Sequence, residues 1–287
     1  SDVKISCEIL EKLGAKINWI DKHTITVDSR NIITTQAPLD LTRKFRASYY
    51  IIGAMLSRMG EVEVGMPGGC KLGARPIDQH IKGFEALGAE VTVEKGTIHA
   101  KANNLTGNSV YMDIVSVGAT INVMLSAVLA KGTTVIDNAA KEPEIVNVAT
   151  FLNNMGAKIT GAGTSTIKIT GVDTLHKCFH EVIPDRIEAG TYILIGALCG
   201  NQLKIDNIIP EHIDSLLSKL EEIGTELEIG ADYIIVSKSD RYKSTNIKTA
   251  VYPGFPTDLQ QPFTVLLTQC NGKSKVMETI WENRFMH

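Results

Sequence analysis

Glu85-Ala86-Leu87-Gly88-Ala89-Glu90-Val91 is one of four copies of a seven-residue pattern, and the spacing of the copies decides the fold. The other copies begin at residues 11, 153 and 221, and the central glycines are spaced by 74, 68 and 68 residues. Such regular spacing is typical of an internal repeat. An amphipathic stretch precedes each glycine, so we predict that each glycine ends a helix in the left-handed conformation. A strand pair follows, for example 89–94 with 97–101.

A second series of glycines interleaves with the first, at intervals of 72, 68 and 72 residues: Gly60, Gly132, Gly200 and Gly272. Each ends an apolar helix and opens a strand, so the predicted unit is helix, strand, helix, strand, strand, about 70 residues long. Full units cover about 40–107, 108–173 and 182–240. Residues 1–30 supply only the second half of a unit and residues 245–287 only the first half of another. A unit that cannot complete its sheet leaves strand edges unpaired, so we expect a fragment of a longer protein, incomplete at both ends.

Composition restricts the class of protein. The chain has 287 residues, 44% hydrophobic, with a formal net charge of −3, enough for a sizeable core in two domains. Five cysteines without regular spacing argue against a disulfide framework and favour a reducing compartment, by default the cytoplasm. There is no secretory signal, no apolar run of membrane length, no long basic run and no metal-ligand spacing among the seven histidines. We therefore expect no nucleic-acid, membrane or metal partner.

The segment Pro67-Gly68-Gly69-Cys70-Lys71-Leu72-Gly73-Ala74-Arg75-Pro76 places a thiol in a glycine-rich loop beside basic side chains, which favour the reactive thiolate. The alternative is a packing cysteine in a turn, as we expect for the other four cysteines. Aligned on the second glycine series, the position of Cys70 is occupied in the other units by Glu142, Pro210 and Glu282. Only one unit has this loop, and departures from a structural rule tend to mark function.

The starts of the first helices in the units are candidate ligand sites. Fourteen residues before each glycine of the second series stand Arg46, Gly118, Arg186 and Asp258. Free amides at helix starts suit phosphate or carboxylate, and Arg46 and Arg75 could bind such groups in bidentate fashion. Ser116 offers a hydroxyl at the second helix start. Asp258 is either a functional carboxylate or an N-cap. Together with Cys70, this predicts a site for a polyanionic substrate with one acid and one base.

Six motifs resemble the UDP-N-acetylglucosamine 1-carboxyvinyltransferase family of enolpyruvyl transferases in order and spacing, over the whole chain. They are Pro67–Asp78 with its cysteine loop, Ser116-Val-Gly-Ala-Thr120, Lys141-Glu-Pro-Glu-Ile-Val146, Ile183-Pro-Asp-Arg-Ile-Glu188, Gly254-Phe-Pro-Thr-Asp258 and Glu282-Asn-Arg-Phe-Met-His287. The resemblance implies an α/β fold, the two-domain inside-out α/β barrel. It also implies transfer of enolpyruvate from phosphoenolpyruvate to the 3-hydroxyl of UDP-N-acetylglucosamine with release of phosphate, a cytoplasmic step of peptidoglycan synthesis and hence of cell wall biogenesis, cell shape and division. No cofactor is implied.

The resemblance also assigns roles. Cys70 matches the cysteine that protonates the vinyl carbon and is alkylated by fosfomycin, and Asp258 matches the base for the sugar hydroxyl. Arg46 and Arg75 match phosphoenolpyruvate ligands. The remaining substrate-binding positions implied are Pro76, Ile77, Asp78, Gln79, Ser116, Val117, Gly118 and Ile280.

Pro184-Asp185-Arg186 is expected to mark the crossing between domains, giving a first domain at 1–183 with the cysteine loop and part of a second at 184–287. Ile114 stands where some members of the family carry a lysine, and the amino-terminal Lys-Asn pair and a carboxy-terminal arginine of the family have no counterpart. We therefore expect no turnover by these residues alone. Two alternatives stay open: an enzyme like 5-enolpyruvylshikimate-3-phosphate synthase, and a non-catalytic UDP-sugar-binding regulator. The oligomeric state is not predicted.

Overall fold

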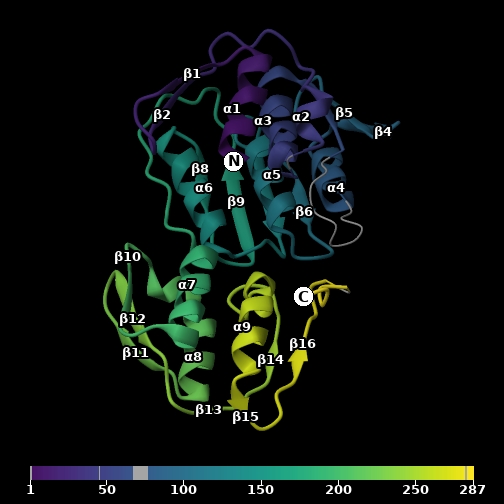
Figure 1. The fold of residues 1–287 in the computed structure, drawn as a ribbon. Coiled ribbons are helices and arrows are strands. Elements are labelled where there is room, and N and C mark those ends of the chain that lie inside the picture. The colour runs from purple at the N-terminus through teal and green to yellow at the C-terminus, as the bar shows by residue number, and fades with distance from the viewer. Residues whose placement is uncertain (1, 45, 67–76, 282) are drawn as a thin grey trace. The chain divides into compact units, whose positions relative to one another are not determined.

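The computed structural model describes residues 2–44, 46–66, 77–281 and 283–287. Contacts divide the chain into two compact units (Figure 1). Unit 1 contains Ser1–Lys141 and Ile145–His180, and unit 2 contains Glu142–Glu144 and Glu181–His287. The division into domains at 1–183 and 184–287 stays a prediction. The contact boundary follows His180, and the earlier segment Glu142–Glu144 is also assigned to unit 2.

Helices and strands alternate along unit 1, in an α/β arrangement. Its first elements, in chain order, are α1 (Asp2–Leu13), β1 (Lys16–Trp19), β2 (Ile25–Asp28), α2 (Leu39–Thr42), the 3-10 helix η1 (Arg46–Tyr49), α3 (Tyr50–Met59) and β3 (Glu61–Gly65). Then follow α4 (Asp78–Ala86), β4 (Glu90–Glu94), β5 (Thr97–Lys101), β6 (Ser109–Tyr111), α5 (Val117–Ala127), β7 (Thr133–Asp137), α6 (Pro143–Asn154), β8 (Lys158–Thr160) and β9 (Thr166–Thr170).

Two sheets of unit 1 have related strand orders. One is β3-β5-β4, antiparallel throughout, and the other is β6-β7-β9-β8, in which only β6 and β7 are parallel. The predicted hairpin 89–101 is present, with Glu94 opposite Thr97. Alternation along β9 turns Ile167 and Ile169 inward, both fully buried, as expected for a sheet with one covered face.

Helices α3 and α4 each pack against α5, and glycines allow their close approach. A Cβ added at Gly53 of α3 would lie 2.5 Å from the carbonyl oxygen of Asn122 in α5. One added at Gly83 of α4 would lie 2.1 Å from Cγ2 of Val123. Any side chain at either position would therefore force the helices apart.

Unit 2 repeats the alternation of helices and strands. Its elements are α7 (Arg186–Cys199), β10 (Leu203–Asp206), η2 (Pro210–Ile213), α8 (Asp214–Ile223), β11 (Glu226–Ile229), β12 (Tyr233–Ser237), β13 (Tyr242–Lys243), β14 (Ile247–Lys248), η3 (Thr257–Leu259), α9 (Gln260–Leu267), β15 (Cys270–Asn271) and β16 (Val276–Met277). The sheet β10-β12-β11 is antiparallel, while β13 pairs with β15 and β14 with β16 in parallel.

The second unit has its own apolar core. Helices α7 and α9 lie side by side (Figure 1), and Ile193, Leu220 and Phe263 are fully buried in the cluster that they form with α8. Asp185 begins α7 by accepting hydrogen bonds from the amides of Ile187 (2.8 Å) and Glu188 (3.2 Å), a capping role typical of aspartate.

The four glycines of the first series all have positive φ, as predicted: Gly14 at 111°, Gly88 at 91°, Gly156 at 100° and Gly224 at 89°. The second series is less uniform. Gly200 ends α7 with φ −76°, and Gly272 follows β15 instead of preceding a strand directly. At Gly200 the glycine is needed for space, because a Cβ there would lie 2.6 Å from the carbonyl oxygen of Gly196.

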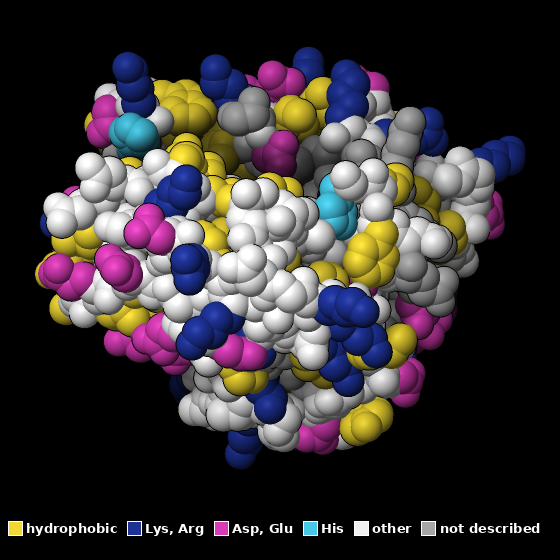
Figure 2. Space-filling model, turned by 60° about the horizontal axis from the view of Figure 1, so that its bottom comes forward, with side chains coloured by type: hydrophobic (Ala, Val, Ile, Leu, Met, Phe, Trp, Pro, Cys, Tyr) yellow, Lys and Arg dark blue, Asp and Glu magenta, His cyan; other side chains and the backbone are white. Residues whose placement is uncertain are grey.

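Charges of both signs are spread over the surface. The face shown in Figure 2 carries Lys and Arg side chains interspersed with Asp and Glu, as expected for a chain with 29 basic and 32 acidic residues. Among the described residues, no helix has the length and apolar character needed to cross a membrane.

Candidate functional site

The start of α4 carries two of the predicted substrate-binding residues, and Gln79 fixes their surroundings. Gln79 Oε1 accepts a hydrogen bond from the backbone amide of Asp113 (2.8 Å), and its Nε2 donates to Asp78 Oδ2 (3.0 Å). Lys82 Nζ lies 2.7 Å from Asp113 Oδ1. Hydrogen bonds from Lys82 and then Gln79 hold the pKa of Asp113 below its usual range. Ile77, which precedes the helix, is buried, whereas the Asp78 side chain is exposed.

The start of α5 has the properties of an anion site. Ser116 is the N-cap, and its hydroxyl accepts from the amide of Ala119 (3.3 Å). The amides of Val117 and Gly118 belong to the first turn, where intrahelical acceptors are lacking. Gly118 is buried, and a Cβ there would lie 2.6 Å from the Tyr49 hydroxyl oxygen. The side chain of Ile114, two residues before the cap, is exposed.

Arg46 is the first residue of η1, as its place in the repeat predicts for a helix start. Its guanidinium carbon lies 5.3 Å from the centre of the Tyr49 ring, within cation–π range. Tyr49 is buried and also faces Gly118. One aromatic side chain thus contacts both Arg46 and the start of α5.

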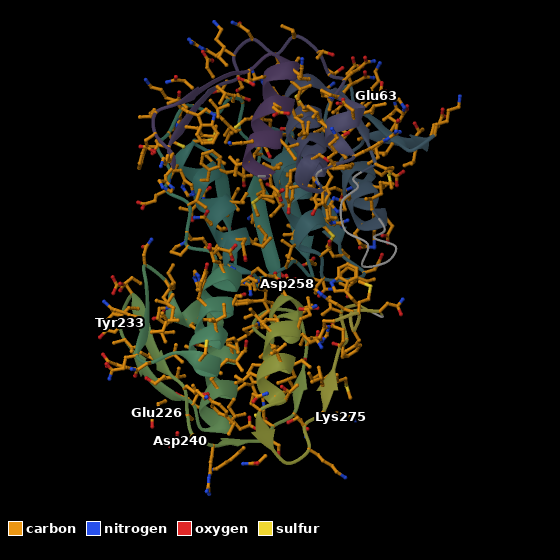
Figure 3. The ribbon with its side chains drawn as sticks, in the orientation of Figure 1. Glu63, Glu226, Tyr233, Asp240, Asp258 and Lys275 are labelled. Atoms are coloured by element: carbon orange, nitrogen blue, oxygen red, sulfur yellow. The ribbon has the colours of Figure 1, made fainter. Side chains whose placement is uncertain are left out.

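Asp258 lies on η3, where the chain leads into α9 (Figure 3), and is 54% exposed. It caps no helix, since neither η3 nor α9 has a side-chain cap hydrogen bond. Its carboxylate instead accepts from Arg284 Nη2, with Oδ1 at 2.5 Å. This favours a functional carboxylate over the N-cap alternative.

The Arg284 side chain is only 13% exposed, and its three nitrogens have separate acceptors. Beside the bond to Asp258, Nη1 donates to Thr257 Oγ1 (3.1 Å). With the Gln261 amide turned so that both of its ends are satisfied, Nε donates to the amide oxygen (2.5 Å). A guanidinium held by three separate acceptors fixes the position of the carboxylate beside it.

Ile280 is held by a second carboxylate, Glu278. Glu278 Oε1 accepts from the amides of Ile280 (2.8 Å) and Trp281 (3.2 Å) and from the hydroxyl of Thr249 (2.8 Å). Oε2 accepts from the hydroxyl of Thr257 (2.9 Å). Glu278 therefore ties the backbone at Ile280 to the residue beside Asp258, and the two site residues predicted in unit 2 belong to one network.

The predicted residues thus fall into three groups. Unit 1 contains Arg46, Ile77, Asp78, Gln79, Ser116, Val117 and Gly118, and unit 2 contains Asp258 and Ile280. Cys70, Arg75 and Pro76 lie outside the described residues. Within the part of the chain that the structure covers, no group of three or more His, Cys, Asp or Glu side chains could hold a metal ion.

Several residues of these networks were not predicted from the sequence. Arg284 stands inside the Glu282-Asn-Arg motif, but nothing in the motif indicated a partner for it. Tyr49 and Glu278 carried no signal, because their roles depend on contacts with Gly118, Thr249 and Thr257, distant in the chain.

Comparison with known proteins agrees with these features. The family model described as EPSP synthase (3-phosphoshikimate 1-carboxyvinyltransferase) matches residues 1–287. UDP-N-acetylglucosamine 1-carboxyvinyltransferase 2 of Bacillus cereus is 55% identical over all 287 residues, which cover 67% of that relative. The protein of the same name from Listeria monocytogenes is 54% identical, and the chain covers 68% of it.

Solved structures share the fold. The enolpyruvyl transferase NikO from Streptomyces tendae superposes with a TM-score of 0.87 at 23% identity, over 99% of this chain and 68% of that one. EPSP synthase from Acinetobacter baumannii gives a TM-score of 0.67 at 17% identity, over 95% of this chain and 64% of that one. The chain therefore belongs to the EPSP synthase family of enolpyruvyl transferases, and within it to the UDP-N-acetylglucosamine 1-carboxyvinyltransferases.

Proposed function

We propose that this transferase moves the enolpyruvyl group of phosphoenolpyruvate to the 3-hydroxyl of UDP-N-acetylglucosamine. The observation that carries the proposal is the 55% identity to relatives of that name over every residue of the chain. The networks around Asp258 and at the start of α5 support it, because they offer a fixed carboxylate and an anion site.

The proposed chemistry is an addition followed by an elimination. Asp258 accepts the proton of the sugar 3-hydroxyl while the oxygen bonds to C2 of phosphoenolpyruvate, and Cys70 supplies a proton to C3. Loss of a proton from C3 then expels phosphate and restores the double bond. Atoms balance, since the hydroxyl and phosphoenolpyruvate give the enol ether and inorganic phosphate.

The proposed binding roles follow the two units. In unit 1, Arg46 and Arg75 bind phosphoenolpyruvate. The uridine diphosphate is bound by Pro76, Ile77, Asp78, Gln79, Ser116, Val117 and Gly118. In unit 2, Ile280 flanks the sugar beside Asp258. The exposed carboxylate of Asp258, with one oxygen paired to Arg284, supports the role of a base, since a base must reach its substrate.

We also propose the inside-out α/β barrel as the architecture of each domain, built from repeated units. It is supported by the recurrence of one strand order, in which the first strand pairs with the third and the third with the second. This order holds for β3-β5-β4, for β7-β9-β8 and for β10-β12-β11.

Alkylation by fosfomycin tests the function. The chain is incubated with fosfomycin with and without UDP-N-acetylglucosamine, and the modified cysteine is identified by peptide mass. We expect modification of Cys70 that UDP-N-acetylglucosamine accelerates, while the exposed thiol of Cys199 serves as the internal control. Equal labelling of Cys199 and Cys70 would show only that fosfomycin reaches both thiols, without a specific reaction at Cys70. No labelling of Cys70 would contradict the proposal.

Phosphate release distinguishes the acceptor. Phosphoenolpyruvate is supplied with either UDP-N-acetylglucosamine or shikimate 3-phosphate, and we expect no phosphate release by these residues alone with either acceptor. Release with UDP-N-acetylglucosamine that the Asp258→Asn variant abolishes would overturn that expectation and identify the acceptor. Turnover only with shikimate 3-phosphate would favour the synthase alternative. Binding of UDP-N-acetylglucosamine without labelling of Cys70 would favour the regulator alternative.

A further inference from the structure

His80 has no role in the proposed chemistry, yet it contacts Tyr49 and the start of α5 from its place in α4. It stands in the first turn of α4, directly after Gln79, and is 4% exposed. Its Cε1 would lie 3.1 Å from a Cβ at Gly118, so the ring covers the start of α5. Its ring centre is 4.8 Å from that of Tyr49, at an interplanar angle of 70°, an edge-to-face contact.

The hydrogen bonds around His80 define its protonation. The amide of Gly53, in the first turn of α3, donates to Asn122 Oδ1 (3.0 Å). Asn122 must then turn its Nδ2, which can only donate, toward His80 Nδ1 at 2.9 Å. Nδ1 is therefore an acceptor, and the neutral ring carries its proton on Nε2.

The surroundings keep this ring neutral. Burial, followed by the charge of Arg46, lowers the pKa of His80 to about 4, and only Asp78 acts in the opposite direction. The other groups that face the ring, Tyr49 and Asn122, bring no formal charge at neutral pH. Arg46 in turn lies over Tyr49. Tyr49 and His80 together therefore connect Arg46 and helix α4 with the start of α5.

We propose that His80 is a positioning residue for nucleotide binding, which holds the start of α5 in register with α3 and α4 through its acceptor Nδ1. The inference rests on the proposed function for its ligand, the uridine diphosphate of UDP-N-acetylglucosamine. Asn122 lies within α5, so its bond to Nδ1 fixes the depth at which Ser116, Val117 and Gly118 present their first-turn amides. Without that acceptor, a buried amide donor is left unsatisfied and the helices must adjust.

Two substitutions separate the acceptor from the ring. His80→Phe keeps a ring beside Tyr49 but removes the acceptor, whereas His80→Asn places an oxygen at the position of Nδ1 and loses the rest of the ring. Leu87→Ala, in a fully buried position just after α4, is the control for lost stability alone. The dissociation constant for UDP-N-acetylglucosamine is measured by calorimetry near neutral pH.

We expect His80→Phe to weaken binding about tenfold, the ratio that corresponds to one lost buried hydrogen bond. His80→Asn should restore affinity to within about threefold of the unaltered chain, although its stability falls, and Leu87→Ala should leave affinity unchanged. Equal weakening by all three variants would show a merely structural role and overturn the proposal.

Measurements that need no ligand keep the inference separate from the proposed function. ¹⁵N NMR of the unaltered chain should show an unprotonated Nδ1 at neutral pH, and a proton on Nδ1 would overturn the proposal even if no variant folds. The amide signals of Ser116, Val117 and Gly118 should move in His80→Phe and stay in Leu87→Ala. If the unaltered chain does not bind UDP-N-acetylglucosamine, the proposed function fails, and these signals alone decide the role of His80.

Discussion

At the residue scale, the neutral imidazole of His80 links the stability of unit 1 to pH. Its pKa falls from 6.5 to about 4 on folding, chiefly because the ring is buried. Because the folded pKa lies below the unfolded one, the unfolded chain binds a proton at His80 more readily than the folded chain. The stability of the folded state is therefore full above pH 6.5 and decreases as the pH falls toward 4. We expect the free energy of unfolding to drop by about 3 kcal/mol over that range.

Urea unfolding of the chain at several pH values measures this loss, with His80→Phe as the comparison. The carboxylates titrate in both proteins, so only the difference between the two pH curves belongs to the imidazole. Parallel curves would contradict the assignment.

Asp258 shows at the same scale why part of the site escapes prediction. Its place at a helix start, like those of Arg46 and Gly118, follows from the spacing of glycines along the chain. Its partner Arg284 lies 26 residues further on, and the amide partner of His80 lies 42 residues away. Contacts of this kind depend on tertiary packing, which a local pattern does not encode.

At the scale of elements, the approach of α4 to α5 depends on Gly83. A methyl group there would meet Val123 Cγ2 at 2.1 Å, so Gly83→Ala should destabilise unit 1 by about 1–3 kcal/mol despite the better helix propensity of alanine. The double variant Gly83→Ala/Val123→Ala should recover part of the loss, because it removes the methyl that is struck. Thermal unfolding of the single and double variants measures these free energies. If the losses from Gly83→Ala and Val123→Ala simply add in the double variant, the contact is not the cause.

Glu278 joins several elements through a single carboxylate. Glu278→Ala removes the acceptor of Thr249, Thr257 and two amides, and we expect a loss of about 2 kcal/mol together with faster hydrogen exchange at the amides of Ile280 and Trp281.

The matched control is Glu222→Ala, which removes another carboxylate of unit 2 that accepts from a lysine and a threonine. It should leave exchange at Ile280 and Trp281 unchanged. Unaltered exchange in Glu278→Ala itself would mean that this segment is held by other contacts.

The elements themselves were largely predictable, because glycines and periodic apolar residues act locally. Gly14, Gly88, Gly156 and Gly224 end their helices in the left-handed conformation as expected, since only glycine adopts it without strain. Gly200 differs because its lack of a side chain provides room beside Gly196, and such a packing requirement is visible only in three dimensions.

At the scale of the whole molecule, each unit has a core of its own. Leu220 of unit 2 and Leu87 of unit 1 are both fully buried, each among residues of its own cluster. We expect Leu220→Ala to cost about 2–5 kcal/mol in unit 2, and Leu87→Ala a similar amount in unit 1. Hydrogen exchange followed by mass spectrometry should show lost protection only in the substituted unit. A loss shared equally by both units would mean that the chain unfolds as one cooperative body.

The segment Glu142–Glu144 is assigned to unit 2, although α6, which begins at Pro143, continues in unit 1, and this limits how the molecule can be dissected. Arg186, with a side chain 12% exposed, donates from Nε to Glu144 Oε1 at 3.1 Å. A gene that encodes only residues 181–287 would produce a unit without that carboxylate. The largely buried guanidinium of Arg186, at the start of α7, would then lack its ion-pair partner. No single cut in the polypeptide yields both halves whole, so a split version of this protein must carry the Glu142–Glu144 segment with its second half.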